Sequence, residues 1–313
     1  YDHLARPAKI VPQLADGMPE VSDDFKTWTV RVRRGIFFAD DPAFKGKQRE
    51  VVAQDFIYAF QRLADAANKS PGWGFLDAQI GIVGLAEARQ AALDAKKPFD
   101  YDAPIEGLRA LDRYTVRFKL REPRPRVVEN LASSDILGAQ AREVVEFYGD
   151  KIDQHPVGSG PFRLKQWRRS SLIVLEKSPH FRDERYDAMP AADDAEGQAI
   201  LARFKGRKLP MIDEVRISII EEAQPFWLAV LNQEIDLVAG QTGSVPGAAV
   251  GEIGTASWEH SVLVVEEPLL DGTTEYSLTP EIRPFTYPGD PEDAEGLALF
   301  PDGTPLIVTK RVD

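Results

Sequence analysis

The sequence contains no cysteine and only four histidines among its 313 residues. A disulfide framework is therefore excluded, and the absence of thiols is typical of proteins exported to an oxidising compartment such as the periplasm. The histidines (His3, His155, His180 and His260) are scattered along the chain and show none of the spacings of zinc ligands. We accordingly expect no metal site and no cofactor.

Long apolar runs and basic clusters are also missing. No segment approaches the roughly 18 consecutive apolar residues that a membrane-spanning helix requires. The chain carries 38 basic and 50 acidic residues, a net charge of −12. Because phosphate backbones are bound by basic stripes and none appears in the sequence, this balance argues against a nucleic-acid partner. A content of 43% apolar residues in a chain of this length is sufficient for two domains, or for one large α/β unit, each with its own core.

Signatures of catalysis are absent from the most suggestive segments. The glycine-rich stretch around Ser159 lacks the Gly-Lys-Ser/Thr of a Walker loop, and Ser159 does not lie in a Gly-x-Ser-x-Gly elbow. Glu234 and Asp236 alternate with apolar residues, which is typical of a turn and the start of a strand, although a catalytic carboxylate pair has the same pattern. We predict that the chain is not an enzyme, and a hydrolase that uses Ser159, Glu234 or Asp236 remains an alternative.

Hydrophobic periodicity predicts a mixed α/β protein. Residues 27–33 (TWTVRVR) alternate, with Trp28, Val30 and Val32 on one face, as in a half-buried strand. Residues 53–65 repeat their apolar positions with a helical period. Further strands are predicted over 114–120, 162–167, 172–176, 214–220, 261–266 and 305–309, and further helices over 84–97, 124–132, 139–148, 200–204 and 225–232.

The segment SPGWGF (70–75) stands outside any periodic pattern. Trp73 and Phe75 lie among Pro71 and two glycines, which predicts a loop that carries two aromatic side chains. Aromatic side chains on loops commonly form the walls of binding clefts, because they supply apolar area at a low entropic cost. The alternative is that both rings pack back on the core and anchor the loop.

Several segments, in this order, carry a family resemblance. They are VSDDFKTWTVRVRRGIFFADDPAF (21–44), preceded by Leu14-Ala15, AQDFIYAFQRL (53–63), HPVGSGPFRLKQW (155–167) followed by SLIVLEKSPHF (171–181), and LPMIDEVRISII…WLAVLNQEIDLVAG (209–240). Together they cover about residues 12–240. This set resembles the family 5 extracellular solute-binding proteins, which are the oligopeptide, dipeptide and nickel receptors of bacterial ABC importers.

The resemblance implies an α/β fold of the type II periplasmic-binding-protein class (cluster C type), with two lobes that close on a ligand. Residues 1–260 would form a core lobe with an inserted subdomain at about 35–155. Residues 261–313 would form a partial second lobe or a return segment, so that the two-lobed fold is incomplete in this chain.

The same resemblance implies a function. The chain would be the periplasmic substrate-binding component of an ABC importer, a monomer that captures peptides or similar small solutes and delivers them to the membrane permease. A ligand-sensing regulatory domain of the same fold, not coupled to transport, is the alternative. The ligand contacts implied by the resemblance, partly by position alone, are Trp73, Phe75, Ala239, Gly240, Gln241, Leu270 and Asp271.

Overall fold

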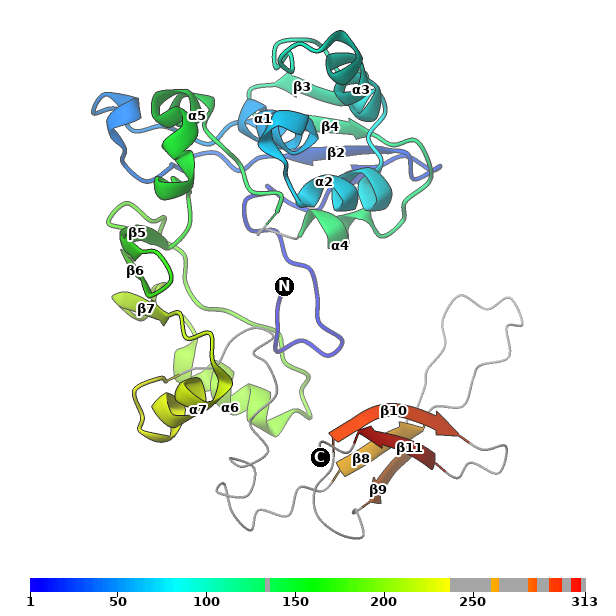
Figure 1. Cartoon of the computed structure of the whole chain (residues 1–313), viewed down its shortest axis with the longest axis vertical. Helices are drawn as coiled ribbons and strands as arrows, with labels where there is room; N and C mark the ends of the chain where they lie inside the picture. Colours follow the sequence, from blue (N-terminus) through cyan, green and yellow to red (C-terminus); the bar gives the residue numbers. More distant parts are fainter. Residues whose placement is uncertain (133–135, 237–259, 265–280, 286–292, 300–304, 311–313) are drawn as a thin grey trace. The chain divides into compact units, whose positions relative to one another are not determined.

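A computed structural model describes residues 1–132 and 136–236, together with the strands at 260–264, 281–285, 293–299 and 305–310. The chain divides into two compact units, Tyr1–Ile219 and Ile220–Asp313. The first unit contains two separate β-sheets with helices, and the second contains a helix and two strand pairs (Figure 1). The described part is mixed α/β, as the periodicity predicts. The domain limits implied by the resemblance stay a prediction.

The larger sheet of the first unit is antiparallel and forms around the predicted alternating strand. Its register sets Trp28 opposite Phe118 and Val30 opposite Val116, so that one face of the sheet is apolar. Trp28, Val116 and Phe118 are buried, which confirms the predicted inward face. The four strands, in spatial order, are β1 (Glu20–Val21), β2 (Thr27–Arg31), β4 (Thr115–Lys119) and β3 (Leu108–Asp112).

Helices pack around this sheet and complete its core (Figure 1). Helix α1 (Ala53–Ala64) points Ile57 and Phe60 inward, and the ring of Phe60 meets that of Phe118 edge-on with centroids 5.3 Å apart. The helix begins where the Asp55 carboxylate accepts the amide N–H of Val52 at 2.7 Å. The helices are α1 (Ala53–Ala64), α2 (Gly72–Phe75), α3 (Leu85–Ala95), α4 (Val127–Leu131) and α5 (Arg142–Tyr148).

The predicted loop at 70–75 is wrong, because Gly72–Phe75 form α2, which continues into a π-helical turn at Leu76–Ile80. The glycines suggested a loop, but Gly72 serves close packing. A Cβ atom at Gly72 would lie 2.9 Å from Cγ2 of Ile136, a distance that real Cβ contacts do not show. The aromatic side chains are therefore presented from a helical turn.

The smaller sheet of the first unit is also antiparallel, with the order β5 (Phe162–Arg168), β6 (Leu172–Lys177) and β7 (Glu214–Ser218). All three strands confirm predicted ones. Helix α6 (Ala195–Phe204) intervenes between β6 and β7, and the Asp194 carboxylate caps it by accepting the amide N–H of Gly197 at 2.9 Å.

The second unit contains helix α7 (Ala223–Leu231) and two antiparallel strand pairs. The predicted helix at 225–232 and the predicted strands at 261–266 and 305–309 are confirmed within two residues at each end. Two strands were missed, because they lie in the stretch rich in proline and glycine. The elements are α7 (Ala223–Leu231), β8 (His260–Val264) paired with β9 (Glu281–Phe285), and β10 (Asp293–Leu299) paired with β11 (Pro305–Lys310).

Candidate functional site

The two aromatic side chains predicted to contact ligand are half-buried on α2. Trp73 and Phe75 both pack against the core of the larger sheet, and both keep part of their surface exposed. The Arg89 guanidinium lies 5.0 Å from the centroid of the Trp73 ring, and its Nη1 donates to the carbonyl of Ala64 at 2.7 Å. Arg89 on α3 thus links the Trp73 ring to the end of α1, and contact of the two half-buried rings with ligand stays a prediction.

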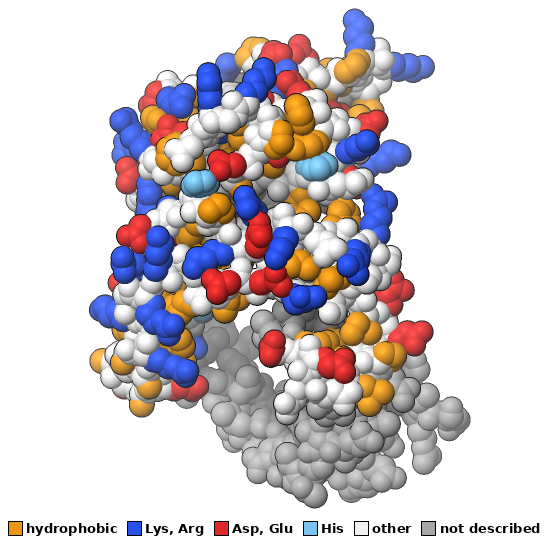
Figure 2. Space-filling view, turned by 90° about the vertical axis from the view of Figure 1, so that its left-hand side faces the viewer, with side chains coloured by type: hydrophobic (Ala, Val, Ile, Leu, Met, Phe, Trp, Pro, Cys, Tyr) orange, Lys and Arg blue, Asp and Glu red, His pale blue; other side chains and the backbone are white. Residues whose placement is uncertain are grey.

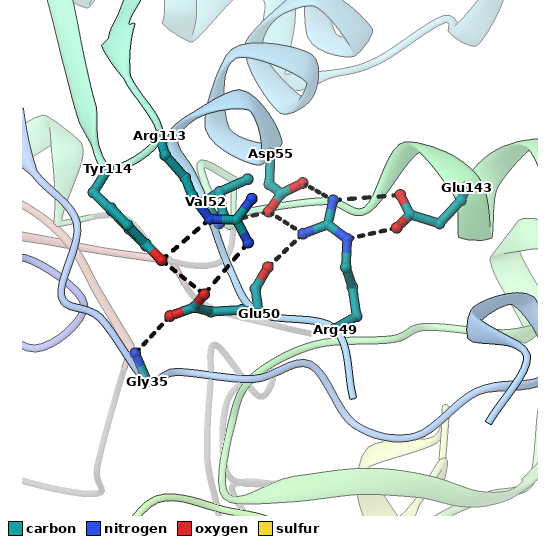
Figure 3. Close-up of polar contacts among 8 residues, drawn as sticks. All are labelled: Gly35, Arg49, Glu50, Val52, Asp55, Arg113, Tyr114 and Glu143. Atoms are coloured by element: carbon teal, nitrogen blue, oxygen red, sulfur yellow. Dashed lines mark hydrogen bonds and ion pairs between the residues drawn. The ribbon is translucent and has the colours of Figure 1, made fainter. Parts of the chain in front are cut away.

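A polar network lies at the start of α1 (Figure 3). The Arg49 guanidinium forms a two-pronged contact with the Asp55 carboxylate, at 2.6 Å and 2.9 Å, and its Nε donates to Glu143 at 2.5 Å. Arg49 and Glu143 are 94 positions apart in sequence. Because the planar guanidinium matches a carboxylate on each side, it ties the N-terminus of α1 to α5.

Burial determines how the charges of this network behave. The Asp55 side chain is almost fully enclosed, and burial raises its pKa even though Arg49 and the Val52 amide oppose the shift. Burial alone would lower the pKa of Arg49, but its hydrogen bonds to Asp55 and Glu143 outweigh this effect and raise the pKa. Arg49 therefore stays charged at any ordinary pH, so it is a fixed electrostatic clamp.

The neighbouring carboxylate, Glu50, belongs to the same network (Figure 3). It accepts the amide N–H of Gly35 and the hydroxyl of Tyr114, both at 2.8 Å, and Arg113 Nη2 at 3.4 Å. The Gly35 amide foremost, together with these side chains, lowers the pKa of Glu50. Each carboxylate of the network accepts hydrogen bonds from neighbouring donors. This arrangement fixes the backbone around the start of α1 and is unsuited to proton transfer.

A second set of contacts joins the segment around residue 40 to the point where the chain passes to the smaller sheet. The Tyr148 hydroxyl donates to Asp41 at 2.9 Å, and the His155 ring stacks on the Tyr148 ring with centroids 3.9 Å apart. His180 Nε2 lies 2.8 Å from the Asp40 carboxylate. These contacts hold the segment around residue 40 against residues 148–180.

The glycine-rich stretch of residues 158–160 lies in the same region. The carbonyl of Ser159 accepts from Arg182 Nη1 at 3.3 Å, and the Arg182 guanidinium also pairs with Glu184. The two carboxylates of the hydrolase alternative, Glu234 and Asp236, are exposed and belong to the second unit. The described residues offer no support for a catalytic arrangement around Ser159.

Charged side chains are mixed in sign on the face drawn in Figure 2. Among the residues that the structure describes, no group of three or more histidine, aspartate or glutamate side chains is placed to hold a metal ion. Within the same described part, no helix is both long and apolar enough to cross a membrane. The remaining predicted ligand contacts, Ala239, Gly240, Gln241, Leu270 and Asp271, lie outside the described residues and stay predictions.

Comparison with known proteins assigns the chain to a family. The sequence model of the bacterial extracellular solute-binding proteins, family 5 Middle, matches residues 9–253. The chain therefore belongs to the family 5 extracellular solute-binding proteins, a class of receptors, and its fold is that of the type II periplasmic binding proteins.

Curated relatives agree with this assignment. The chain is 33% identical over 162 residues to the periplasmic oligopeptide-binding protein OppA of Salmonella typhimurium. The aligned residues are 51% of this chain and 27% of that protein. It is 30% identical over 172 residues to the dipeptide-binding protein of Escherichia coli, covering 53% and 28%. The chain thus matches less than a third of the length of these relatives.

Solved structures show the same fold. The periplasmic murein tripeptide-binding protein MppA, in its unliganded open form, matches with a TM-score of 0.56 and 22% identity over 82% of this chain and 42% of its own. The periplasmic binding protein DppA of Helicobacter pylori, in complex with the peptide STSA, matches with a TM-score of 0.52 and 21% identity over the same shares.

Proposed function

We propose that this chain is part of the periplasmic substrate-binding component of an ABC importer, and that it captures peptides or peptide-like solutes and passes them to the permease. The observation that carries the proposal is the family match over residues 9–253. Its relatives include proteins named for oligopeptide and dipeptide binding. We further propose that it acts as a monomer, so that one closed receptor meets one permease.

Two features of the first unit support this role, namely a framework joined by polar contacts and two partly exposed aromatic rings. The Arg49 network and the contacts of Tyr148 and His180 fix the first unit as one framework. A rigid framework limits the ordering entropy that ligand binding costs. Trp73 and Phe75 offer partly exposed rings on this framework, and residues 239–241 and 270–271 are the proposed further contacts.

Native mass spectrometry tests the proposal directly. The protein is expressed from its complete gene, isolated from the periplasm under gentle conditions and measured before and after denaturation. We expect bound species with the masses of short peptides, released on denaturation. Their absence, together with no thermal stabilisation by di-, tri- and pentapeptide mixtures, would contradict the proposal, because a ligand of the folded state must raise its stability.

Coupling to transport is a separate measurement. A reconstituted permease should hydrolyse ATP faster when the peptide-loaded protein is added. Peptide binding without any stimulation of ATP hydrolysis would favour the regulatory alternative over import.

A matched pair of tryptophan substitutions tests the aromatic surface. We expect Trp73→Ala to weaken peptide binding by about tenfold or more, because a ring at a binding surface contributes on the order of 1–2 kcal/mol. Trp167→Ala is the control, since Trp167 on β5 is also partly exposed and also lies near a guanidinium, that of Arg169 at 5.4 Å. Isothermal titration calorimetry gives both affinities. Unchanged affinity with lowered stability in Trp73→Ala would show that Trp73 is a packing residue only.

A further inference from the structure

The edge of the larger sheet contains an irregularity before β1. Ala15 forms a β-bridge with Val32, whereas Glu20 pairs with Thr29. Residues 16–19 therefore face only two residues of β2, so the chain bulges away from the sheet. Gly17 has a φ of +94°, a conformation that glycine adopts without the penalty a side chain would impose.

A cavity of about 210 Å³ lies beneath this bulge, inside the first unit. Its lining includes Val30 and Val116 from the sheet, Phe56 and Phe60 from α1, Leu131 from α4 and Met18 from the bulge. Of the described residues that line it, none has a charged side chain. Trp73 and Phe75 are not among the described residues that line it, so the cavity is distinct from these two predicted peptide contacts.

The cavity is partly open to solvent, and its volume exceeds that of the voids found inside packed proteins. Protein interiors are packed as densely as organic crystals, and few voids exceed the size of a water molecule. Water gains little along most of this lining, because it needs two to four polar partners and, among the described lining residues, only Tyr1 and Gln13 have polar side chains. In another protein, an apolar cavity of about 150 Å³ stays dry and binds benzene. By the same measure, a cavity of 210 Å³ has room for about eight non-hydrogen atoms.

Met18 indicates that the cavity opens outward. It lines the cavity, yet it is 57% exposed, so it stands at the mouth and does not fill the space. A methionine side chain is unbranched and adapts to different neighbours, which suits the rim of a site that opens to admit a molecule.

We propose that this pocket, here called the Met18 pocket, is a second ligand site that binds a small uncharged apolar molecule, such as a single aromatic ring with a short aliphatic substituent. The site is separate from Trp73 and Phe75, and the proposal does not depend on the proposed function. Burial of the ligand's apolar surface drives the binding.

Toluene is a suitable probe, because its seven non-hydrogen atoms match the volume. In methyl NMR spectra of the folded protein, we expect saturable shifts confined to the methyl groups of Met18, Val30, Val116 and Leu131. The dissociation constant should be on the order of 0.1–1 mM for a molecule of this size. An absence of shifts, or shifts spread over the whole protein without saturation, would overturn the proposal.

Substitutions then locate the site. Met18→Trp should fill the pocket and weaken toluene binding at least tenfold, whereas Met189→Trp, at a methionine with similar exposure of 53%, should leave it unchanged. Leu131→Trp fills the same space from α4 and serves if Met18→Trp fails to fold. Equal toluene affinity in the wild type and in a folded filling variant would place any binding elsewhere and refute the Met18 pocket. A short peptide should not displace toluene.

Discussion

The two sheets of the first unit have different sources of stability. The sheet β1–β2–β4–β3 and its helices bury a large contiguous apolar core. Among the described residues after Val144, and leaving proline aside, only Val174 and Ala229 have buried aliphatic or aromatic side chains. On the smaller sheet β5–β6–β7, apolar side chains on neighbouring strands pair while still partly exposed. Trp167 lies opposite Ile173, and Ile173 lies opposite Ile217.

The two sheets also use charge differently. Around the larger sheet, Arg49 and Asp55 form an ion pair of which the carboxylate is only 3% exposed. On the smaller sheet, the pair of Arg163 and Glu176 is 37% and 31% exposed. Desolvated pairs couple strongly to folding, whereas exposed pairs contribute little. Most of the folding free energy of the described part should thus reside in the region around the larger sheet.

The largest effect should come from opening a cavity in that core. Leu120→Ala removes a side chain that is 2% exposed, and we expect a loss of about 2–5 kcal/mol in the free energy of unfolding. Ile217→Ala on β7, where the side chain is 42% exposed, should cost less than about 1 kcal/mol. Urea denaturation of both variants measures the difference. Equal losses would show that the smaller sheet is as well packed as the larger one.

The next effect concerns charge. Arg49→Met leaves the Asp55 carboxylate enclosed without its partner, and we expect a loss of about 2–4 kcal/mol at neutral pH, somewhat below a fully buried pair because Arg49 is 25% exposed. Arg163→Met is the matched control on the smaller sheet and should cost less than about 1 kcal/mol.

The same variant has a distinctive pH dependence. Burial already raises the pKa of Asp55, and removal of Arg49 should raise it further. A folded pKa above the unfolded one means that the folded state binds more protons, so Arg49→Met should regain stability as the pH falls from 7 towards 5. A loss that does not change over this range would argue that Asp55 is not the group left unpaired.

Local patterns predicted what depends on local sequence. The strand at 27–33 and the helix at 53–65 emerged from periodicity alone, because each buries one face against the same core. The turn at Trp73 was misjudged, since the close approach of Gly72 to Ile136 is a tertiary contact that composition does not reveal. The pairing of Arg49 with Glu143 was equally hidden by their separation in sequence.

The cavity under Met18 was out of reach for another reason. It depends on the register between residues 15–20 and β2, which no pattern in the sequence specifies. The candidate contacts at Trp73 and Phe75 came from unusual composition together with family resemblance. Sequence reasoning thus located segments well and contacts between distant segments poorly.

The smallest expected effect concerns Glu50, whose contribution to the stability of the region around the larger sheet should depend on pH. The Gly35 amide and the Tyr114 hydroxyl hold the pKa of Glu50 below its ordinary value of 4.5. Its contribution to stability is therefore present above about pH 4.5 and is lost as the pH falls through the lower folded pKa. Glu50→Gln should cost less than about 1 kcal/mol at pH 7 and progressively less towards pH 3, because the neutral amide mimics the protonated acid. Urea titrations at both values measure this. An equal cost at pH 7 and pH 3 would mean that Glu50 acts through packing alone, and that the charge contrast between the sheets rests on Arg49.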